Sequence, residues 1–116
     1  IACYYMEELR HEKQEHTKLL MLNTKSMLLG ECDISKGTVD ASIITPRELF
    51  IEALQKNAVA IVIMHNHPSG DPSPSQEDIY TTARIKEAGD LIGIKLLDHI
   101  IIGNNCYISF REEGML

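Results

Sequence analysis

Tryptophan is absent from this sequence, phenylalanine occurs twice, and basic residues are in deficit. Among 116 residues there are 11 Lys and Arg against 17 Asp and Glu, which gives a formal net charge of −6 at pH 7. Surfaces that bind nucleic acids typically need a basic patch and often aromatic side chains for base stacking. We therefore expect no direct nucleic-acid binding by this domain.

Long hydrophobic runs and paired cysteines are also lacking. The longest uncharged apolar run, over 58–64, has seven residues, whereas a membrane-spanning helix needs about 20. The start of the chain has no basic segment followed by an apolar stretch, as a signal peptide would. Cys3, Cys32 and Cys106 form no C-x-x-C pair, so we interpret them as reduced, mostly buried thiols. These features predict a cytoplasmic protein without membrane association.

The composition that is present is typical of one folded domain. Hydrophobic residues make up 44% and charged residues 24%, close to the averages for soluble globular proteins. The length fits a single domain over residues 1–116. Because the first residue is Ile1 rather than Met, we interpret the chain as part of a longer protein.

Hydrophobic periodicity and turn residues predict a mixed α/β layer fold. The run over 58–64 is apolar on both faces and should form a central strand. Cap-plus-proline patterns at Thr45-Pro46 and Ser73-Pro74 should start helices. The expected elements are a helix over 2–14, a hairpin of strands 17–22 and 27–29, a short strand within 38–44, a helix over 46–56, the strand 58–64, a helix to about 88 with Gly89 or Gly93 near its end, and a hairpin of strands 95–102 and 106–110.

Two histidines follow the predicted central strand. Residues i and i+2 of an extended chain point to the same side, so His65 and His67 can bind one ion. Asp78 lies on the first turn of the next predicted helix. Two His and one carboxylate are the ligands of many catalytic zinc sites, where water takes the fourth position. The histidine pair alone fits a polar turn with two solvated side chains equally well.

The whole string is more specific than the pair. His65, His67, seven further residues, Ser75, two residues and Asp78 give the pattern H-x-H-x7-S-x2-D. This pattern resembles the signature of JAMM (MPN-plus) metalloproteases. The segments HNHPSGDPSPSQED, DHIIIG and KGT are similar to the bacterial RadC-like branch of that family.

The resemblance covers residues 15–116 and implies a fold. A JAMM/cytidine-deaminase-like layer architecture has a mixed, curved β-sheet flanked by helices, with one zinc ion at the end of the central strand. The helix-hairpin-helix-like segment that precedes this domain in RadC proteins is not part of this sequence.

The resemblance also implies a zinc-dependent hydrolase that cleaves amide, peptide or isopeptide bonds in a peptide or protein substrate. His65, His67 and Asp78 would bind Zn²⁺, which activates water. Ser75 would stabilise the oxyanion, although a serine at a helix start can also be a cap. Because Ser73 and Pro74 fit the cap better, we expect Ser75 to be available for chemistry.

The family mechanism needs a glutamate as general base. In RadC-like sequences, a Glu stands just before an apolar strand that ends in a Leu-Asp/Asn-Thr turn. Glu15 has this position before 17–24 and is our choice, while Glu12 is the competitor. His99 follows Asp98 in a predicted apolar strand, and we interpret it as a hydrogen-bonded structural residue rather than a ligand.

Two other functions stay open from the sequence. The first is a non-catalytic metal-binding domain that interacts with a partner, although structural zinc sites usually close the fourth position with protein. The second is a DNA-repair-associated module or nuclease, as the RadC family name suggests. The acidic composition argues against the second function.

Overall fold

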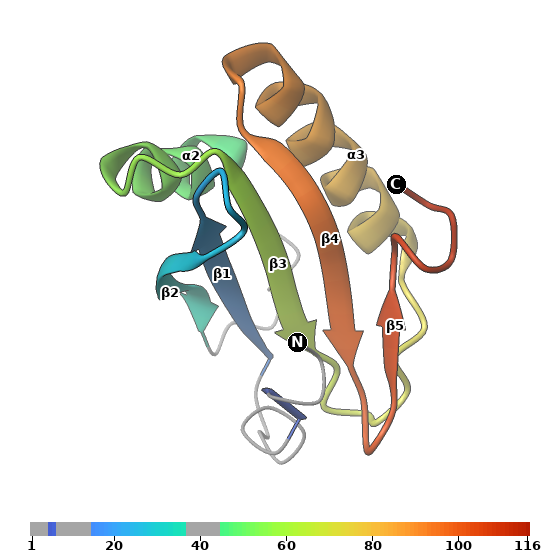
Figure 1. The fold of residues 1–116 in the computed structure, drawn as a ribbon. Coiled ribbons are helices and arrows are strands. Elements are labelled where there is room, and N and C mark those ends of the chain that lie inside the picture. The colour runs from blue at the N-terminus through green and yellow to red at the C-terminus, as the bar shows by residue number, and fades with distance from the viewer. Residues whose placement is uncertain (1–4, 7–14, 37–44) are drawn as a thin grey trace.

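The structure is a computed structural model that describes residues 5–6, 15–36 and 45–116 (Figure 1). The expected strand within 38–44 lies outside these residues, as does the expected helix over 2–14 except for Tyr5 and Met6, which are helical. The elements of the described part are β1 (His16–Leu22), β2 (Leu28–Lys36), α2 (Pro46–Gln55), β3 (Ala60–Asn66), α3 (Gln76–Ile92), β4 (Lys95–Ile102) and β5 (Tyr107–Ser109).

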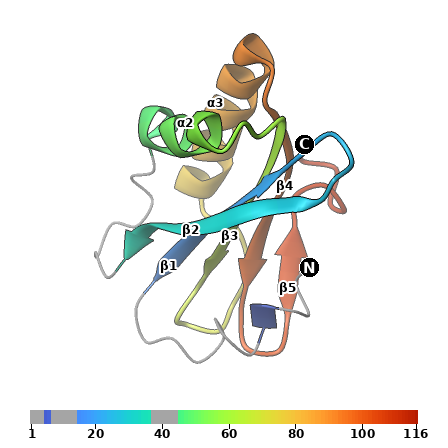
Figure 2. The same ribbon diagram turned by 60° about the vertical axis from the view of Figure 1, so that its left-hand side comes forward.

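The strands form one open, mixed sheet in the order β2-β1-β3-β4-β5. Strands β3 and β4 are parallel and are joined through α3, whereas the other neighbours are antiparallel. The sheet is strongly twisted, since β2 runs across the direction of β4 and β5 (Figure 2). The sequence-based fold class, a mixed sheet with helices packed on it, is confirmed.

Strand β3 is the predicted central strand, and all seven of its residues are buried. It begins two residues later than expected, at Ala60, and continues through Asn66. His65 therefore belongs to the strand and not to the loop, because its backbone continues the pairing with β1 and β4.

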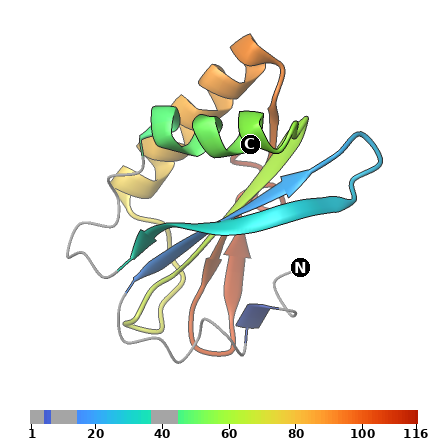
Figure 3. The same ribbon diagram turned by 90° about the vertical axis from the view of Figure 1, so that its left-hand side faces the viewer.

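The two faces of the sheet carry separate hydrophobic clusters. Helices α2 and α3 lie on one face (Figure 3), where side chains at odd positions of β1 and β3 meet them. Side chains at even positions pack on the other face, with Tyr5 and Met6 against them. The helix-side cluster includes Leu19, Met21, Leu49, Phe50, Ala53, Ile61, Ile63, Ile85, Ile94 and Leu96.

Helix α2 starts as the sequence predicts. The Thr45 side chain accepts a hydrogen bond from the Glu48 N–H, and Pro46 occupies the first turn. Helix α3 runs four residues beyond the expected end, to Ile92, and Gly93 closes it with a left-handed φ of 81°. Gly89 is therefore internal to α3.

The hairpins formed where they were expected, with one difference. Strand β2 reaches Lys36, whereas the sequence predicted an end near residue 29. The reason is tertiary, because β1 pairs with β2 from His16↔Lys36 to Leu22↔Leu28, through Gly30 and the polar residues after it. Cys32 and Cys106 are free thiols, and they are half-buried rather than buried.

One negative finding concerns membranes. Among the residues that the structure describes, no helix combines the length and the apolar character needed to cross a bilayer.

Gly89 provides a test of the packing between α3 and the chain that follows it. A Cβ at this position would lie 2.2 Å from the Ile94 carbonyl oxygen and 3.3 Å from Phe50. We expect Gly89→Ala to lower the free energy of unfolding by about 1–3 kcal/mol, measured by urea denaturation. The matched control is Gly30→Ala, where the nearest atoms are flexible side-chain ends at 3.6 Å or more. Equal stabilities of the two variants would contradict this packing.

Candidate metal centre

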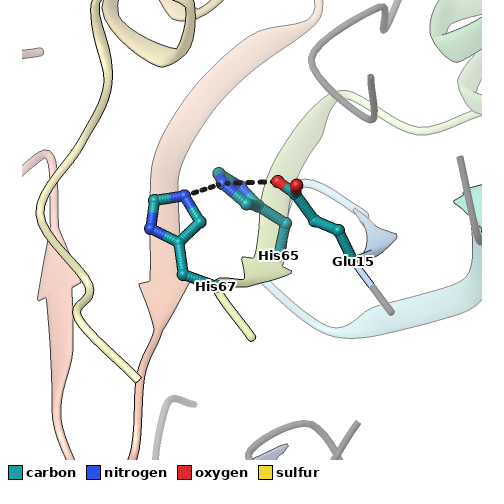
Figure 4. A group of neighbouring side chains, drawn as sticks. All are labelled: Glu15, His65 and His67. Carbon is teal, nitrogen blue, oxygen red and sulfur yellow. Dashed lines mark hydrogen bonds and ion pairs between the residues drawn. The ribbon is translucent and has the colours of Figure 1, made fainter. Parts of the chain in front are cut away.

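The candidate centre lies where β3 ends, on the face of the sheet that carries the helices. His65 continues the odd-numbered series of β3, so its side chain points toward this face, and His67 follows two residues later. Thr17 of β1 pairs with His65, which brings Glu15, two residues before Thr17, to the same end. Figure 4 shows the Glu15, His65 and His67 side chains pointing toward one another.

These three side chains could hold a metal ion, because they offer ligand atoms that all lie within 4.8 Å of one another. The two Nε2 atoms of His65 and His67 are 3.1 Å apart. One Glu15 oxygen lies 3.6 Å from the His65 Nε2. The predicted solvated histidine turn does not describe His65, whose side chain is buried.

Asp78 reaches the same point from the first turn of α3. Its Oδ1 lies 3.4 Å from the His65 Nε2 and its Oδ2 lies 3.3 Å from the His67 Nε2. The Asp78 side chain is 7% exposed, against 25% for Glu15. The structure thus brings one buried and one partly exposed carboxylate to the two imidazoles.

The closeness of these side chains shifts the pKa values of Asp78 and His67. Burial raises the pKa of Asp78, but hydrogen bonds with His65 and then His67 outweigh it and hold the pKa well below its usual value. The hydrogen bond with Asp78 raises the pKa of His67, against the opposing effect of burial. Asp78 is therefore an anion at neutral pH and is suited to pair with a cation.

The donor set itself favours a cation. The Nδ1 of His67 lies 3.0 Å from the Asp71 carbonyl oxygen, which only accepts, so the proton of the neutral ring is on Nδ1 and Nε2 carries a lone pair. The same Nε2 donates to the Asp78 carboxylate when the ring is protonated, and it directs its lone pair to this point, beside the Nε2 of His65, when that proton is lost.

Comparison with known proteins identifies the family of this chain. A family model described as the RadC-like JAB domain matches residues 1–115. The chain belongs to the RadC-like JAB domain family. A UPF0758 protein of Clostridium kluyveri is 52% identical over 115 residues, which are 99% of this chain and 50% of that protein. A UPF0758 protein of Clostridium botulinum is 55% identical over 116 residues, which are 100% of this chain and 51% of that protein.

The chain spans about half the length of these relatives. The names of the relatives state no activity, so the chemistry of this RadC-like JAB domain has to be argued from its own residues. The resemblance to the RadC-like branch, inferred from the motif, is confirmed.

The loop of this RadC-like JAB domain that carries His67 is held by the turn between β4 and β5. The His67 N–H donates to the Ile102 carbonyl, and the Asn104 N–H donates to the Gly70 carbonyl. Gly103 lies directly beneath this contact, since a Cβ there would come within 2.4 Å of the Gly70 carbonyl oxygen. The G of the DHIIIG segment thus allows the loop to approach the sheet closely.

His99, on β4, is a hydrogen-bonded residue next to the centre, as the sequence predicted. Its Nε2 lies 2.8 Å from the Nδ1 of His65, and its Nδ1 lies 2.5 Å from the Thr82 hydroxyl. The ring stacks on Phe110 with centroids 4.7 Å apart. Burial lowers the pKa of His99 well below its ordinary value, so the ring is neutral.

Sequence reasoning missed Thr82. The available signal was its spacing, because residues four apart on a helix share a face and Asp78 had already been selected. Glu12, the competitor of Glu15, lies outside the described residues.

Ser75, and not Ser73, caps α3, so the sequence-based choice of cap is wrong. The Ser75 side chain accepts from the Asp78 N–H at 3.0 Å, and Asp78 Oδ2 accepts from the Ser75 N–H at 2.8 Å. This reciprocal capping box also fixes the Asp78 carboxylate. Ser73 instead bonds Asp71 in an exposed turn. Among the described residues nothing accepts the proton of the Ser75 hydroxyl, which leaves that proton available for donation.

Removal of the cap should have a measurable cost. We expect Ser75→Ala to lower the free energy of unfolding by about 1 kcal/mol, because one N–H of the first turn loses its acceptor. Denaturant unfolding in the presence of a chelator measures this effect without a contribution from bound metal. Ser73→Ala is the control and should leave the stability nearly unchanged. A larger loss for Ser73→Ala would mean that α3 begins where the sequence alone suggested.

Proposed function

We propose that this domain is a zinc-dependent hydrolase of amide, peptide or isopeptide bonds. The observation that carries the proposal is the convergence of two imidazole nitrogens and two carboxylates in a RadC-like JAB domain. Zinc is favoured over magnesium or calcium because two of the four groups are imidazoles, and those ions prefer oxygen ligands.

The spacing of the donor atoms fits a tetrahedral ion. Ligand atoms at ~2.0–2.1 Å from zinc, arranged tetrahedrally, lie about 3.4 Å from one another. The two Nε2 atoms are 3.1 Å apart, the Asp78 Oδ1 lies 3.4 Å from the Nε2 of His65, and the Asp78 Oδ2 lies 3.3 Å from the Nε2 of His67, so each imidazole has one Asp78 oxygen at about this spacing. These three residues are therefore the proposed ligands, and the fourth position is left for water.

The two carboxylates have different roles in this proposal. Asp78 contacts both imidazoles and is well buried, which suits a permanent ligand. Glu15 lies 3.6 Å from the His65 Nε2 and is partly exposed, which suits a group that exchanges protons with water and substrate.

The reaction proposed is addition of water to a carbonyl. A zinc ion at this site supplies Lewis-acid chemistry, which lowers the pKa of water toward ~7 and polarises the carbonyl. Glu15 accepts a proton from the attacking water and delivers it to the leaving nitrogen as the C–N bond breaks, which yields a carboxylic acid and an amine. The Ser75 hydroxyl donates to the carbonyl oxygen as negative charge develops on it. No covalent bond to the protein forms.

The alternative is a metal-bearing domain without catalysis. It requires the same three ligands but gives Glu15 no task. Experiments on Glu15 therefore distinguish the two functions, whereas experiments on the ligands test the metal that both of them need.

We expect about one zinc ion per chain in protein purified without chelator, measured by elemental analysis. Asp78→Asn and the double variant His65→Ala, His67→Ala should both lose the metal. Glu15→Gln is the matched control and should keep it, since Glu15 is not proposed as a ligand. Full zinc occupancy in the double variant, or loss of zinc in Glu15→Gln alone, would contradict this division of roles.

The Glu15→Gln variant tests catalysis. Glutamine keeps the shape of the side chain but cannot accept the proton, so turnover should fall by roughly 10²–10⁴-fold. The assay measures cleavage of a peptide or isopeptide substrate that is selected from a library. A chelator must abolish this cleavage. Glu12→Gln should have little effect. If Glu12→Gln removes activity and Glu15→Gln does not, the general base is Glu12, and if neither variant changes it, the mechanism is wrong.

A further inference from the structure

A chain of buried hydrogen bonds leads from the candidate metal centre back to α3. The His65 Nδ1 lies 2.8 Å from the His99 Nε2, and the His99 Nδ1 lies 2.5 Å from the Thr82 Oγ1. The Thr82 hydroxyl in turn lies 2.7 Å from the Asp78 carbonyl oxygen. All four residues are buried, and the chain joins β3, β4 and α3.

The direction of each hydrogen bond in this chain follows from its last member. A carbonyl oxygen only accepts, so the single proton of the Thr82 hydroxyl points to Asp78. Thr82 must then accept from His99, which puts the His99 proton on Nδ1. A neutral imidazole has one N–H, so the His99 Nε2 is an acceptor.

The directions of these hydrogen bonds determine the tautomer of His65. Because the His99 Nε2 accepts, the His65 Nδ1 must carry a proton, so in the neutral His65 ring the lone pair is on Nε2, which faces the Asp78 carboxylate. We propose that Thr82 and His99 are positioning residues that hold His65 in its metal-binding tautomer.

A single hydrogen bond determines the same tautomer in His67. Its Nδ1 donates directly to the Asp71 carbonyl oxygen. Both histidines are thus oriented by hydrogen bonds that end on backbone carbonyls, which cannot change their role when solvent or substrate changes. For His65, which is deeper in the fold, two side chains are needed to reach such a carbonyl.

Burial keeps His99 in the neutral form that this chain requires. Its side chain is 1% exposed, its ring lies against Phe110, and neither of its nitrogens bonds a carboxylate. Charging such a ring would cost desolvation without an ionic partner.

The inference rests on the zinc site of the proposed function but not on hydrolysis, so it can be tested apart from activity. The first test is nitrogen-15 NMR of the imidazoles in the metal-free wild-type protein, with the pH raised until the imidazole signals no longer change. We expect both His65 and His99 to carry the proton on Nδ1 and a bare Nε2. A proton on the Nε2 of His65 would overturn the proposal.

The second test compares two variants of Thr82. Thr82→Val keeps the shape of the side chain but removes the hydroxyl, whereas Thr82→Ser keeps the hydroxyl. We expect Thr82→Val to weaken zinc binding by about 10–100-fold, measured by competition with a chromophoric chelator. Thr82→Ser should bind close to the wild-type affinity. His99→Phe preserves an aromatic ring beside Phe110 but removes both nitrogens, and it should weaken binding as Thr82→Val does.

The outcomes separate the possible failures. If Thr82→Val binds zinc like the wild type, or binds it less tightly with the tautomer of His65 unchanged, the positioning role is wrong and Thr82 acts through packing. If the wild-type protein binds no zinc, the proposed function fails, while the NMR of the metal-free protein still decides whether Thr82 and His99 set the tautomer of His65.

Discussion

The position of the candidate metal centre depends on β3, which is hydrogen-bonded to β1 on one side and to β4 on the other. Side chains alternate along this strand, so Ile61 and Ile63 in the helix-side core place His65 on the same face. A slip of one residue would send His65 to the opposite face, together with every apolar side chain of the strand. Hydrophobic burial thus specifies the geometry of the polar site, because the same register serves both.

The helix-side core is polar at the start of α3 and apolar toward its end. Its buried residues include Asp78, Thr82, Ile85 and Gly89, which share one face. The first two are polar, Ile85 packs in the apolar cluster, and Gly89 lies against Ile94 and Phe50. Buried polar atoms cost free energy unless they are paired. In the described part of the chain, every buried side-chain nitrogen and oxygen has a partner. The polar end of the core is therefore compatible with a stable fold.

Local signals in the sequence predicted which helices and strands form, but not where tertiary contacts make them begin and end. The α2 start followed from Thr45 and Pro46, which act within one turn. The α3 start was predicted at Ser73, because a following proline is favourable, yet the reciprocal bonds between Ser75 and Asp78 select a later one. Similarly, β2 extends past its polar residues because β1 pairs with all of them. These choices depend on contacts that single-sequence patterns do not contain.

The sequence likewise predicted only part of the candidate site. Period two placed His65 and His67 on one side of the strand, and the motif spacing added Asp78. The contact of Thr82 with His99 joins residues 17 apart on different elements, and no local pattern implies it. Only the packing of α3 on β4 brings these two side chains together.

The difference in burial between the two carboxylates bears on function. With neutral imidazoles, Asp78 and Glu15 bring two negative charges to one point, which a divalent cation offsets. A site that only binds metal would gain most from burying both carboxylates, since buried charges attract the ion more strongly. Glu15, just before β1, instead stays partly exposed, and its oxygen lies 3.6 Å from the His65 Nε2, slightly farther than the Asp78 oxygens lie from the two imidazoles. A carboxylate in that position has access to both water and the ion's surroundings, which is what proton transfer during hydrolysis requires.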